Sequence, residues 1–172
     1  VMVIEPKVFG DARGFFFESF NQKAFNEATG LDVNFVQDNH SRSAKGVLRG
    51  LHYQIKQPQG KLVWVVAGEI FDVAVDIRRT SPAFGQWQGI VLSEHKAQQL
   101  WLPPGFAHGF QALSDDAELL YLHSADYAPE HEGGLSVNDP RLAIAWPLPV
   151  NNLSARDSSH PALDQHFAGV RL

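Results

Sequence analysis

The sequence predicts an all-β fold, closed into a barrel or a jelly roll whose interior can hold a small ligand. From residue 33 onward, short strand-like segments follow one another at close intervals, with turn residues between them. Only one segment of ten or more residues, 21–30, has the pattern of a helix. The clearest alternation of apolar and polar side chains, over residues 70–77, has the period of a strand.

Composition indicates one soluble domain, spanning residues 1–172. Hydrophobic residues make up 44% of the chain and charged residues 19%, which is typical of globular proteins. The formal net charge of −5, without a long Lys/Arg run, argues against nucleic-acid binding and leaves room only for a local cationic pocket. The absence of cysteine excludes disulfides, thiolate catalysis and Cys-ligated metals.

The ends of the chain carry no predicted targeting or membrane segment. The apolar start is too short for a signal-peptide core, and no apolar run has spanning length. We therefore expect a cytoplasmic protein without a membrane partner. The tail beyond Pro147 is rich in Pro, Asn and Ser and is expected to wrap over the barrel, with a short helix near residues 163–167.

The N-terminal region predicts contact with a neighbouring subunit. Its expected elements are strands at residues 3–4 and 15–20, with a turn at residues 9–14. Within the second strand, neighbouring phenylalanines such as Phe15 and Phe16 point to opposite faces, so both faces need cover from this chain or another. The peripheral helix follows, with Asn21 as its N-cap and Gly30 as its stop.

The remaining segments predict the strands of the barrel. They are residues 34–39, 47–54, 61–67, 69–77, 87–92, 99–102, 109–112, 118–123 and 142–145. In the alternating strand, Asp72 and Asp76 share one face, and the favoured interpretation exposes them to solvent.

Strand periodicity places chemically active side chains on common faces. The three sets that share a face are Gly50, His52 and Gln54; Lys61, Val63 and Val65; and Leu119, Tyr121 and His123. If these faces point inward, the interior contains histidine, lysine and tyrosine together.

The stretch of residues 46–54 combines anion binding with proton transfer, because Arg49 and His52 lie between two glycines. Their odd spacing puts them on opposite faces of a regular strand. A bulge or bend near Gly50 would let both reach one ligand. A second Gly-rich, aromatic stretch, residues 103–110, adds His108.

A metal centre is the first alternative for this many histidines. Metal-binding jelly rolls pair two histidines two residues apart with a nearby carboxylate. Here the position two residues after His52 is Gln54, and Lys61 lies in the region where the carboxylate would be needed. We therefore expect no metal. A lone histidine is also more often a satisfied core residue than a base, although Arg49 and Lys61 favour a functional role for His52.

Histidine, lysine and tyrosine without a metal suit proton abstraction next to a carbonyl group. The imidazole takes the proton, the cation stabilises the oxyanion, and the phenol supplies a proton from the other side, as epimerisation requires. A phosphate or diphosphate could be held by forked hydrogen bonds from Arg49 with Arg13, and from Arg78 or Arg156.

Several segments together resemble the dTDP-4-dehydrorhamnose 3,5-epimerase family from about residue 3 to residue 167. They are residues 11–18, 37–39, 46–52, 59–61, 71–78 with 81–85, 104–110 and 121–132. The resemblance implies a double-stranded β-helix (cupin) jelly roll with a short peripheral helix or two, its N-terminal strands and C-terminal tail packing on the barrel or the dimer partner.

The resemblance also implies catalytic roles. His52 matches the general base, Asp157 the carboxylate that orients it, Tyr121 the general acid and Lys61 the lysine near the C4 oxygen. The positions that match contacts to the nucleotide sugar are Gln37, Asn39, Arg49, His108, Tyr127, Glu132 and Arg156. In the family's homodimers, the residues matching Arg13, Phe16 and Glu18 reach the neighbour's site.

The implied reaction converts dTDP-4-dehydro-6-deoxy-D-glucose to dTDP-4-dehydro-L-rhamnose, for dTDP-L-rhamnose biosynthesis, without a cofactor, because the C4 ketone acidifies C3 and C5. Arg156 and His123 depart from the residues expected at their positions. Three alternatives stay open: a mono-epimerase or isomerase on a related dTDP-4-keto sugar, a non-catalytic sugar-nucleotide-binding cupin, and a metal-dependent cupin oxygenase.

Overall fold

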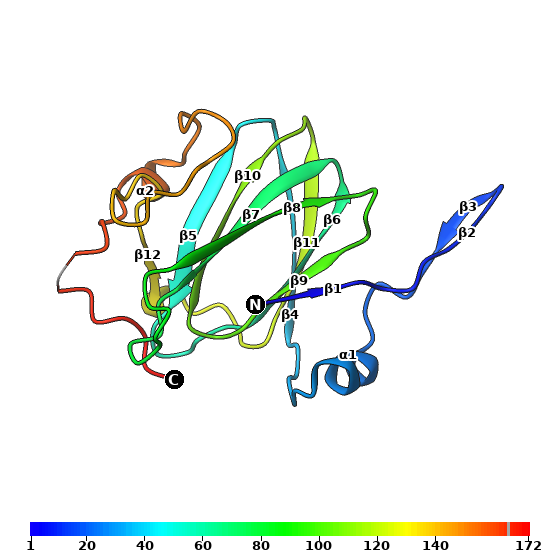
Figure 1. Ribbon diagram of the computed structural model, residues 1–172, viewed down its shortest axis with the longest axis horizontal. Coiled ribbons are helices and arrows are strands. Elements are labelled where there is room, and N and C mark those ends of the chain that lie inside the picture. The colour runs from blue at the N-terminus through cyan, green and yellow to red at the C-terminus, as the bar shows by residue number, and fades with distance from the viewer. Residues whose placement is uncertain (165) are drawn as a thin grey trace.

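Two five-stranded antiparallel sheets face each other in the computed structural model, which describes residues 1–164 and 166–172 (Figure 1). The first sheet has the order β1-β9-β6-β11-β4 and the second β12-β5-β10-β7-β8. The strands of the first sheet are β1 (Met2–Ile4), β4 (Gln37–Ser43), β6 (Lys61–Ala67), β9 (Gln99–Leu102) and β11 (Ala117–His123). Those of the second are β5 (Leu48–Gln54), β7 (Glu69–Asp76), β8 (Trp87–Ser93), β10 (Phe106–Ala112) and β12 (Glu132–Gly134). The predicted all-β class is confirmed.

The space between the sheets is filled by apolar side chains from both. Val63 and Leu119 of the first sheet pack with Ile70, Ala74 and Phe110 of the second. Their strand positions are those that periodicity places on the inward faces of β6 and β11. Lys61 and Tyr121 therefore also point between the sheets.

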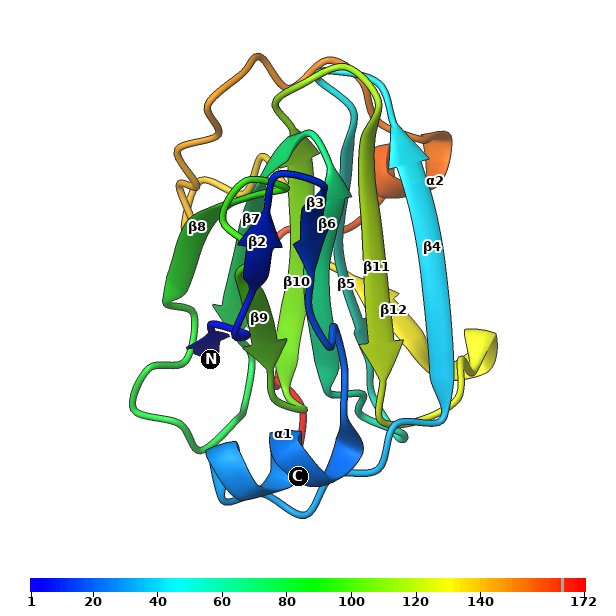
Figure 2. The ribbon, with the colours of Figure 1, turned by 90° about the vertical axis from the view of Figure 1, so that its right-hand side faces the viewer.

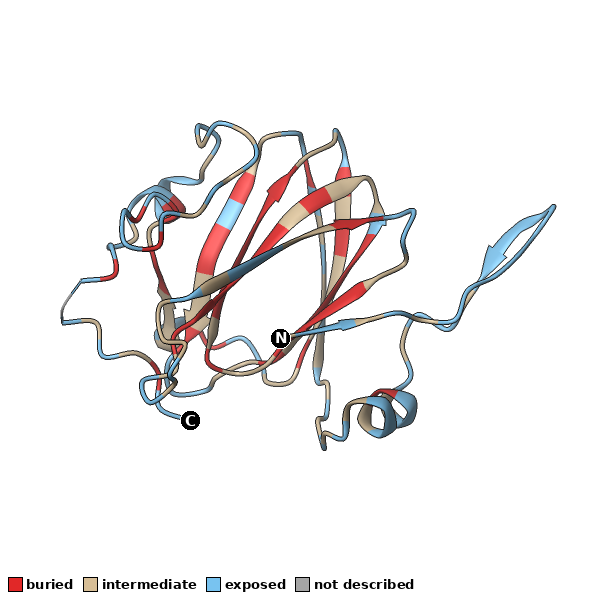
Figure 3. Ribbon diagram, viewed as in Figure 1, coloured by how far each residue is buried: buried red, intermediate tan, exposed pale blue. Residues whose placement is uncertain are grey.

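The second sheet is buried on its outer face as well, by the C-terminal tail. Val73 and Val75 of β7 pack there against Leu142, Leu163 and Val170. Figure 3 shows the central strands of this sheet largely buried. Both faces of β7 are therefore covered. One face packs between the two sheets and the other packs under the tail, so neither face of this alternating strand meets solvent.

The expected exposure of Asp72 and Asp76 is therefore wrong. Their residues are 0% and 2% exposed. Asp76 accepts hydrogen bonds from Arg78 and Ser81, at 2.5 and 2.6 Å, and Asp72 accepts one from His108. Both carboxylates thus have polar partners, as buried charges require, although Asp72 Oδ1 has no hydrogen-bond partner among the described residues.

The tail contains no strand over residues 142–145, contrary to expectation. The carboxylate of Asp139 accepts the backbone N–H groups of Arg141 and Leu142, which turns the chain. Leu142 is still buried, so its apolar pattern serves packing without a ladder. A helix, α2 (Ala155–Ser158), lies earlier than the one expected near residues 163–167, where no described residue is helical and Gln165 lies outside the described residues.

Part of the outer face of the first sheet is covered by α1 (Gln22–Thr29). Its N-cap is Asn21, whose side chain accepts the N–H of Ala24 at 3.0 Å, and Gly30 ends it at φ 69°, as predicted. Phe25 meets Trp101 edge-on, with ring centroids 5.4 Å apart.

The N-terminal hairpin, β2 (Phe9–Asp11) with β3 (Gly14–Phe16), projects away from the barrel in Figure 1. In Figure 2, which views the molecule from that side, the hairpin is drawn in front of the barrel. Residues 17–20 leave the ladder, so the strand expected over residues 15–20 ends early. Phe15 and Phe16 are each 74% exposed. The remaining element is a 3-10 helix, η1 (Pro129–His131), before β12, and no helix of the described residues is long and apolar enough to cross a membrane.

A bulge in β5 lies where the sequence predicts it. Between His108 and Phe110 of β10, the paired positions on β5 run from His52 to Arg49, which leaves one extra residue on β5. The backbones touch closely here: a Cβ on Gly50, which has φ 129°, would lie 2.5 Å from Gly109 Cα, and one on Gly109 would lie 2.7 Å from the carbonyl oxygen of Arg49. Only glycine fits at either position.

Candidate active site

One cavity between the sheets, of about 150 Å³, is surrounded by polar side chains. Its lining residues are Asn39, His52, Tyr53, Gln54, Gln59, Lys61, Tyr121, His123, Tyr127 and Glu132. Larger hollows lie beside Arg78 and beside the N-terminal hairpin. They lack this combination of acid, base and cation, so the smaller cavity is the candidate site.

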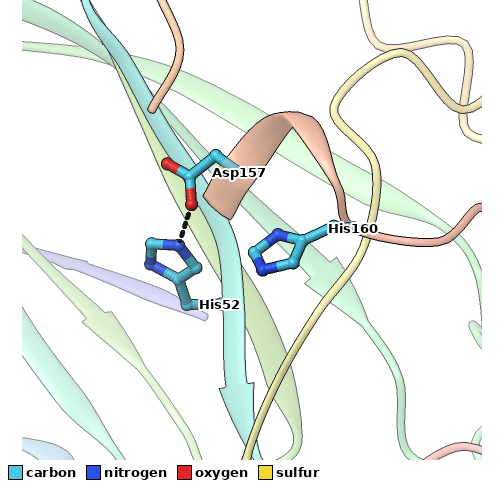
Figure 4. Close-up of side chains that lie close together, drawn as sticks. All are labelled: His52, Asp157 and His160. Carbon is cyan, nitrogen blue, oxygen red and sulfur yellow. Dashed lines mark hydrogen bonds and ion pairs between the residues drawn. The ribbon is translucent and has the colours of Figure 1, made fainter. Parts of the chain in front are cut away.

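His52 and Asp157 form a dyad on one wall of the cavity (Figure 4). The His52 Nε2 lies 2.7 Å from Asp157 Oδ1, and Asp157 Oδ2 accepts the N–H of Gly50 at 3.3 Å. Burial acts to raise the pKa of Asp157, but the hydrogen bond and charge of His52 hold that pKa below its ordinary value. An ionised carboxylate only accepts, so Nε2 carries the hydrogen, and in the neutral form of the ring Nδ1 is the nitrogen that can take a proton.

Helix α2 positions this carboxylate. Ser154 caps the helix by accepting the N–H of Asp157 at 3.0 Å. Asp157 is 5% exposed, so its orientation is fixed by packing as well as by the cap.

The bulge turns Arg49 toward the same side of β5 as His52. Arg49 is paired with Phe110 and His52 with His108, and both partners face the space between the sheets. Directly paired residues of an antiparallel ladder share a face. The Arg49 side chain is exposed at the rim, where its Nε donates to Ser43 Oγ at 3.1 Å.

Lys61 and Tyr121 come from the opposite sheet and line the same cavity. Burial lowers the pKa of Lys61 to about 8, against the opposing charges of Asp72 and Glu132. The ammonium group is thus held in a partly desolvated position, where a negative charge on a ligand would be stabilised by it.

Three polar side chains lie beneath and beside Lys61. His108 Nε2 is 2.8 Å from Asp72 Oδ2, and both residues are buried. His123 is directly opposite Lys61 in the ladder between β11 and β6. Burial, then the charges of Lys61 and His108, lowers the pKa of His123 to about 3, which leaves its imidazole uncharged.

The mouth of the cavity is formed by Tyr127, Glu132 and Arg156. The Tyr127 hydroxyl donates to Glu132 Oε2 at 2.6 Å, and Arg156 pairs with the same oxygen. Burial acts to raise the pKa of Glu132, but these hydrogen bonds hold that pKa below its ordinary value. Gln37 joins the group, since it donates to Asn39 at 3.0 Å and accepts the Tyr127 N–H at 2.8 Å.

Three predicted binding residues are not in this cavity. Arg13, Phe16 and Glu18 belong to the N-terminal hairpin and the segment after it, which points away from the barrel (Figure 1). Arg13 instead pairs with Asp11 at 2.5 Å. Within one chain, these side chains do not reach the site.

Gln54 has a structural task in this chain. It is 4% exposed, and its amide binds the carbonyl oxygens of Gln57 and Asp126 and the N–H of Ala128. It thereby holds the loop that carries Tyr127.

The ligand atoms of His52, Asp157 and His160 lie within 4.8 Å of one another, which makes them the one candidate metal group among the described residues. Donor atoms around a tetrahedral zinc, at about 2.0–2.1 Å each, are separated by roughly 3.4 Å. The His52 Nε2–Asp157 Oδ1 distance of 2.7 Å is shorter than that and is the distance of a direct hydrogen bond, which already accounts for two of the three members.

The sequence did not single out His160 or Asp72 for the site. His160 follows the C-cap of α2, three residues after Asp157, and its ring meets that of His52 edge-on with centroids 5.6 Å apart (Figure 4). For His160, the available signal was its position three residues after Asp157. For Asp72, the signal was its place in a strand flanked by apolar residues.

The fold and the cavity define a jelly-roll protein with a small-molecule site equipped for acid–base chemistry. A family model described as dTDP-4-dehydrorhamnose 3,5-epimerase matches residues 1–165. The chain belongs to this family, and the expected cupin jelly roll is confirmed.

Relatives named dTDP-4-dehydrorhamnose 3,5-epimerase include proteins of two bacteria. That of Pseudomonas aeruginosa is 64% identical over 148 residues, covering 86% of this chain and 82% of the relative. That of Salmonella typhimurium is 56% identical over 167 residues, covering 96% of this chain and 91% of the relative.

A solved epimerase of Legionella pneumophila, in complex with dTDP-4-keto-L-rhamnose, superposes with a TM-score of 0.93 at 52% identity, over 99% of this chain and 92% of the other. A 3'-monoepimerase of Streptomyces bikiniensis, in complex with dTDP-quinovose, has a TM-score of 0.87 at 38% identity, over 93% of this chain and 82% of the other.

Proposed function

We propose that this protein epimerises dTDP-4-dehydro-6-deoxy-D-glucose at C3 and C5, giving dTDP-4-dehydro-L-rhamnose for dTDP-L-rhamnose biosynthesis. The observation that carries the proposal is the pairing of His52 on one sheet with Asp157 of α2, across a cavity from Lys61 and Tyr121 on the other sheet. Relatives at 56–64% identity carry the name of this activity.

The reaction starts with a proton leaving a carbon next to the C4 ketone. The free Nδ1 of His52 takes the proton, and Asp157 stabilises the imidazolium that forms. The electrons move to the C4 oxygen as an enolate, whose charge the Lys61 ammonium stabilises. Tyr121 returns a proton to the opposite face of the carbon, which inverts its configuration. The ketone is the electron sink, so the chemistry needs no cofactor.

The dimensions of the cavity favour the sugar ring as its occupant. A volume of about 150 Å³ is well below the 300–1,000 Å³ or so of a site for a whole drug-sized ligand. The nucleotide then lies outside, where Arg49 at the rim can bind a diphosphate oxygen and Gln37 and Asn39 can position the ligand. Tyr127, Glu132 and Arg156 hold the sugar end at the mouth, and His108 supports the floor.

The N-terminal hairpin favours a homodimer. Phe15 and Phe16, each 74% exposed, stand beside an apolar hollow that includes Trp64, Val66 and Leu120. Exposed aromatic patches of this kind mark protein interfaces. A second copy covering them would let Arg13, Phe16 and Glu18 reach the partner's cavity. We also propose that residues 1–172 act as one domain and that the protein works in the cytoplasm, where sugar nucleotides are made.

Solvent exchange tests the activity. The protein is incubated with dTDP-4-dehydro-6-deoxy-D-glucose in deuterated water, and NMR locates the label. Deuterium at both C3 and C5 is expected. A protein that incorporates no label at any carbon has a different function.

The same experiment decides between double and single epimerisation, an alternative favoured by the likeness to the 3'-monoepimerase. Label at one carbon only would assign the chain to the single-site class. His52→Ala serves as the control: it should abolish exchange at both carbons while dTDP binding, measured by calorimetry, is retained.

A further inference from the structure

His123 is a polar side chain that lines the cavity, and none of the steps of the proposed reaction uses it. It is 5% exposed, and neither ring nitrogen has a hydrogen-bond partner in the structure. Buried polar groups nearly always have hydrogen-bond partners, and a buried group whose hydrogen bond is missing destabilises a fold by about 1–3 kcal/mol. A partner for this imidazole is therefore expected from a ligand.

Its neighbours place that partner. His123 is paired directly with Lys61 across the ladder, where facing Cβ atoms are about 4.5–5.5 Å apart. Its ring centroid lies 5.2 Å from that of Tyr121, and all three side chains line the cavity. One ligand oxygen that contacts Lys61 at this wall is within reach of the imidazole too.

The charge state of the ring suits a donor. With a pKa near 3, lowered by burial and then by Lys61 and His108, His123 carries one N–H and no charge at neutral pH. A second cation beside Lys61 would be repelled, whereas a neutral N–H adds a hydrogen bond without that repulsion.

We propose that His123 is a catalytic residue that donates a hydrogen bond to the C4 oxygen of the sugar, beside Lys61. The proposal rests on the proposed epimerase function. The developing enolate then has two donors, a cation and a neutral imidazole, and the second supplies a directional bond that holds the oxygen in place. Because both deprotonations place charge on this same oxygen, His123 serves C3 and C5 alike.

Replacing the ring tests the proposal. His123→Phe keeps the aromatic volume and removes both nitrogens, and loss of one oxyanion donor lowers kcat by about 10²–10³. Exchange at C3 and C5 should fall by the same factor, with little change in KM. His123→Gln, which keeps an N–H, should recover part of the loss. The matched control is His40→Phe. The His40 side chain lies on the neighbouring strand β4 and is 57% exposed, so this variant should catalyse exchange at the wild-type rate.

A spectrum of the unaltered protein keeps the proposal testable if the variants do not fold. In ¹⁵N-labelled protein, the ring nitrogens of His123 should show the neutral form from pH 5 to 9. The N–H signal should move when the dehydro sugar nucleotide binds, and stay in place with dTDP alone.

Two results would overturn the proposal. One is a His123→Phe variant with wild-type stability and less than a threefold loss of kcat. The other is an N–H signal of His123 that does not move when the dehydro sugar nucleotide binds. In either case the wild type still incorporates deuterium. Failure of the wild type to exchange would instead reject the epimerase function itself.

Discussion

Replacing Lys61 with methionine should make the protein more stable and less active. The ammonium group is held between the two sheets, and burial lowers its pKa from 10.5 to about 8. Folding therefore disfavours the charged form, and the unfavourable contribution is fully present at pH values below about 8. Methionine keeps most of the side-chain length and removes the charge.

The magnitude follows from the two pKa values. At about 1.4 kcal/mol per pH unit, a pKa of about 8 in place of 10.5 corresponds to at most about 3 kcal/mol at pH 7. The partial exposure of the side chain makes this an upper limit. For a domain of this size, about 3 kcal/mol raises Tm by roughly 6–12 °C.

The pH dependence has a definite sign. As pH rises from 8 toward 10.5, folded Lys61 is already neutral while the unfolded chain still binds the proton, so wild-type stability rises. The advantage of Lys61→Met should therefore shrink to roughly half by pH 9.5. Activity moves the other way, because the enolate loses its cation, and kcat should fall by about 10²–10³.

Urea unfolding at pH 7 and pH 9.5, together with the deuterium-exchange assay, measures both effects. The control is Lys56→Met, which removes an exposed lysine of the neighbouring loop and should change neither quantity. A Lys61→Met protein that is less stable than wild type at pH 7, or whose advantage grows with pH, would refute the reasoning.

Four further predictions concern the site and its supports. Asp157→Asn removes a charge-assisted hydrogen bond of 2.7 Å, worth about 1.5–3 kcal/mol, so steady-state kinetics should show kcat reduced roughly 10–150-fold; an unchanged kcat contradicts the dyad. The kcat profile should decline above about pH 8 as Lys61 loses its proton, and the Lys61→Met variant should lack this limb. Gly109→Ala should lower the free energy of unfolding by at least about 2 kcal/mol, because its Cβ would lie 2.7 Å from the Arg49 carbonyl oxygen; Gly10→Ala, with 3.7 Å to the nearest atom, is the mild comparison, and equal denaturation midpoints would count against the close contact. Treatment with EDTA followed by dialysis should leave turnover unchanged, and a loss restored by zinc or iron would instead assign a metal to His52, Asp157 and His160.

Most of the barrel could be predicted from local pattern. Strand period placed Lys61 and Tyr121 on inward faces, and glycine at position 50 predicted the bulge that brings Arg49 to the side of His52. These predictions succeeded because side-chain direction in a strand depends on residue parity, which the sequence displays.

The failures share one cause. Burial of Asp72 and Asp76 depends on the first sheet, which packs on the face of β7 that they share with Ile70 and Ala74. The packing of Leu142 without a strand depends on the outer face of the second sheet, which the tail crosses. A segment far along the chain decides whether a strand face meets solvent, and no local pattern records that. The boundaries of β4 and β10 also moved by a few residues, as ladder partners and not propensity set strand ends.

By itself, the sequence determined the all-β class, the inward faces of the strands and the kinds of side chain available for proton transfer, because these follow from residue types and their spacing. Only the tertiary structure decided which of them meet. Asp157 reaches His52 across 105 positions of the chain, and His123 is left opposite Lys61 without a partner. Both depend on long-range packing, which brings distant segments together and removes the water that would otherwise satisfy their polar groups.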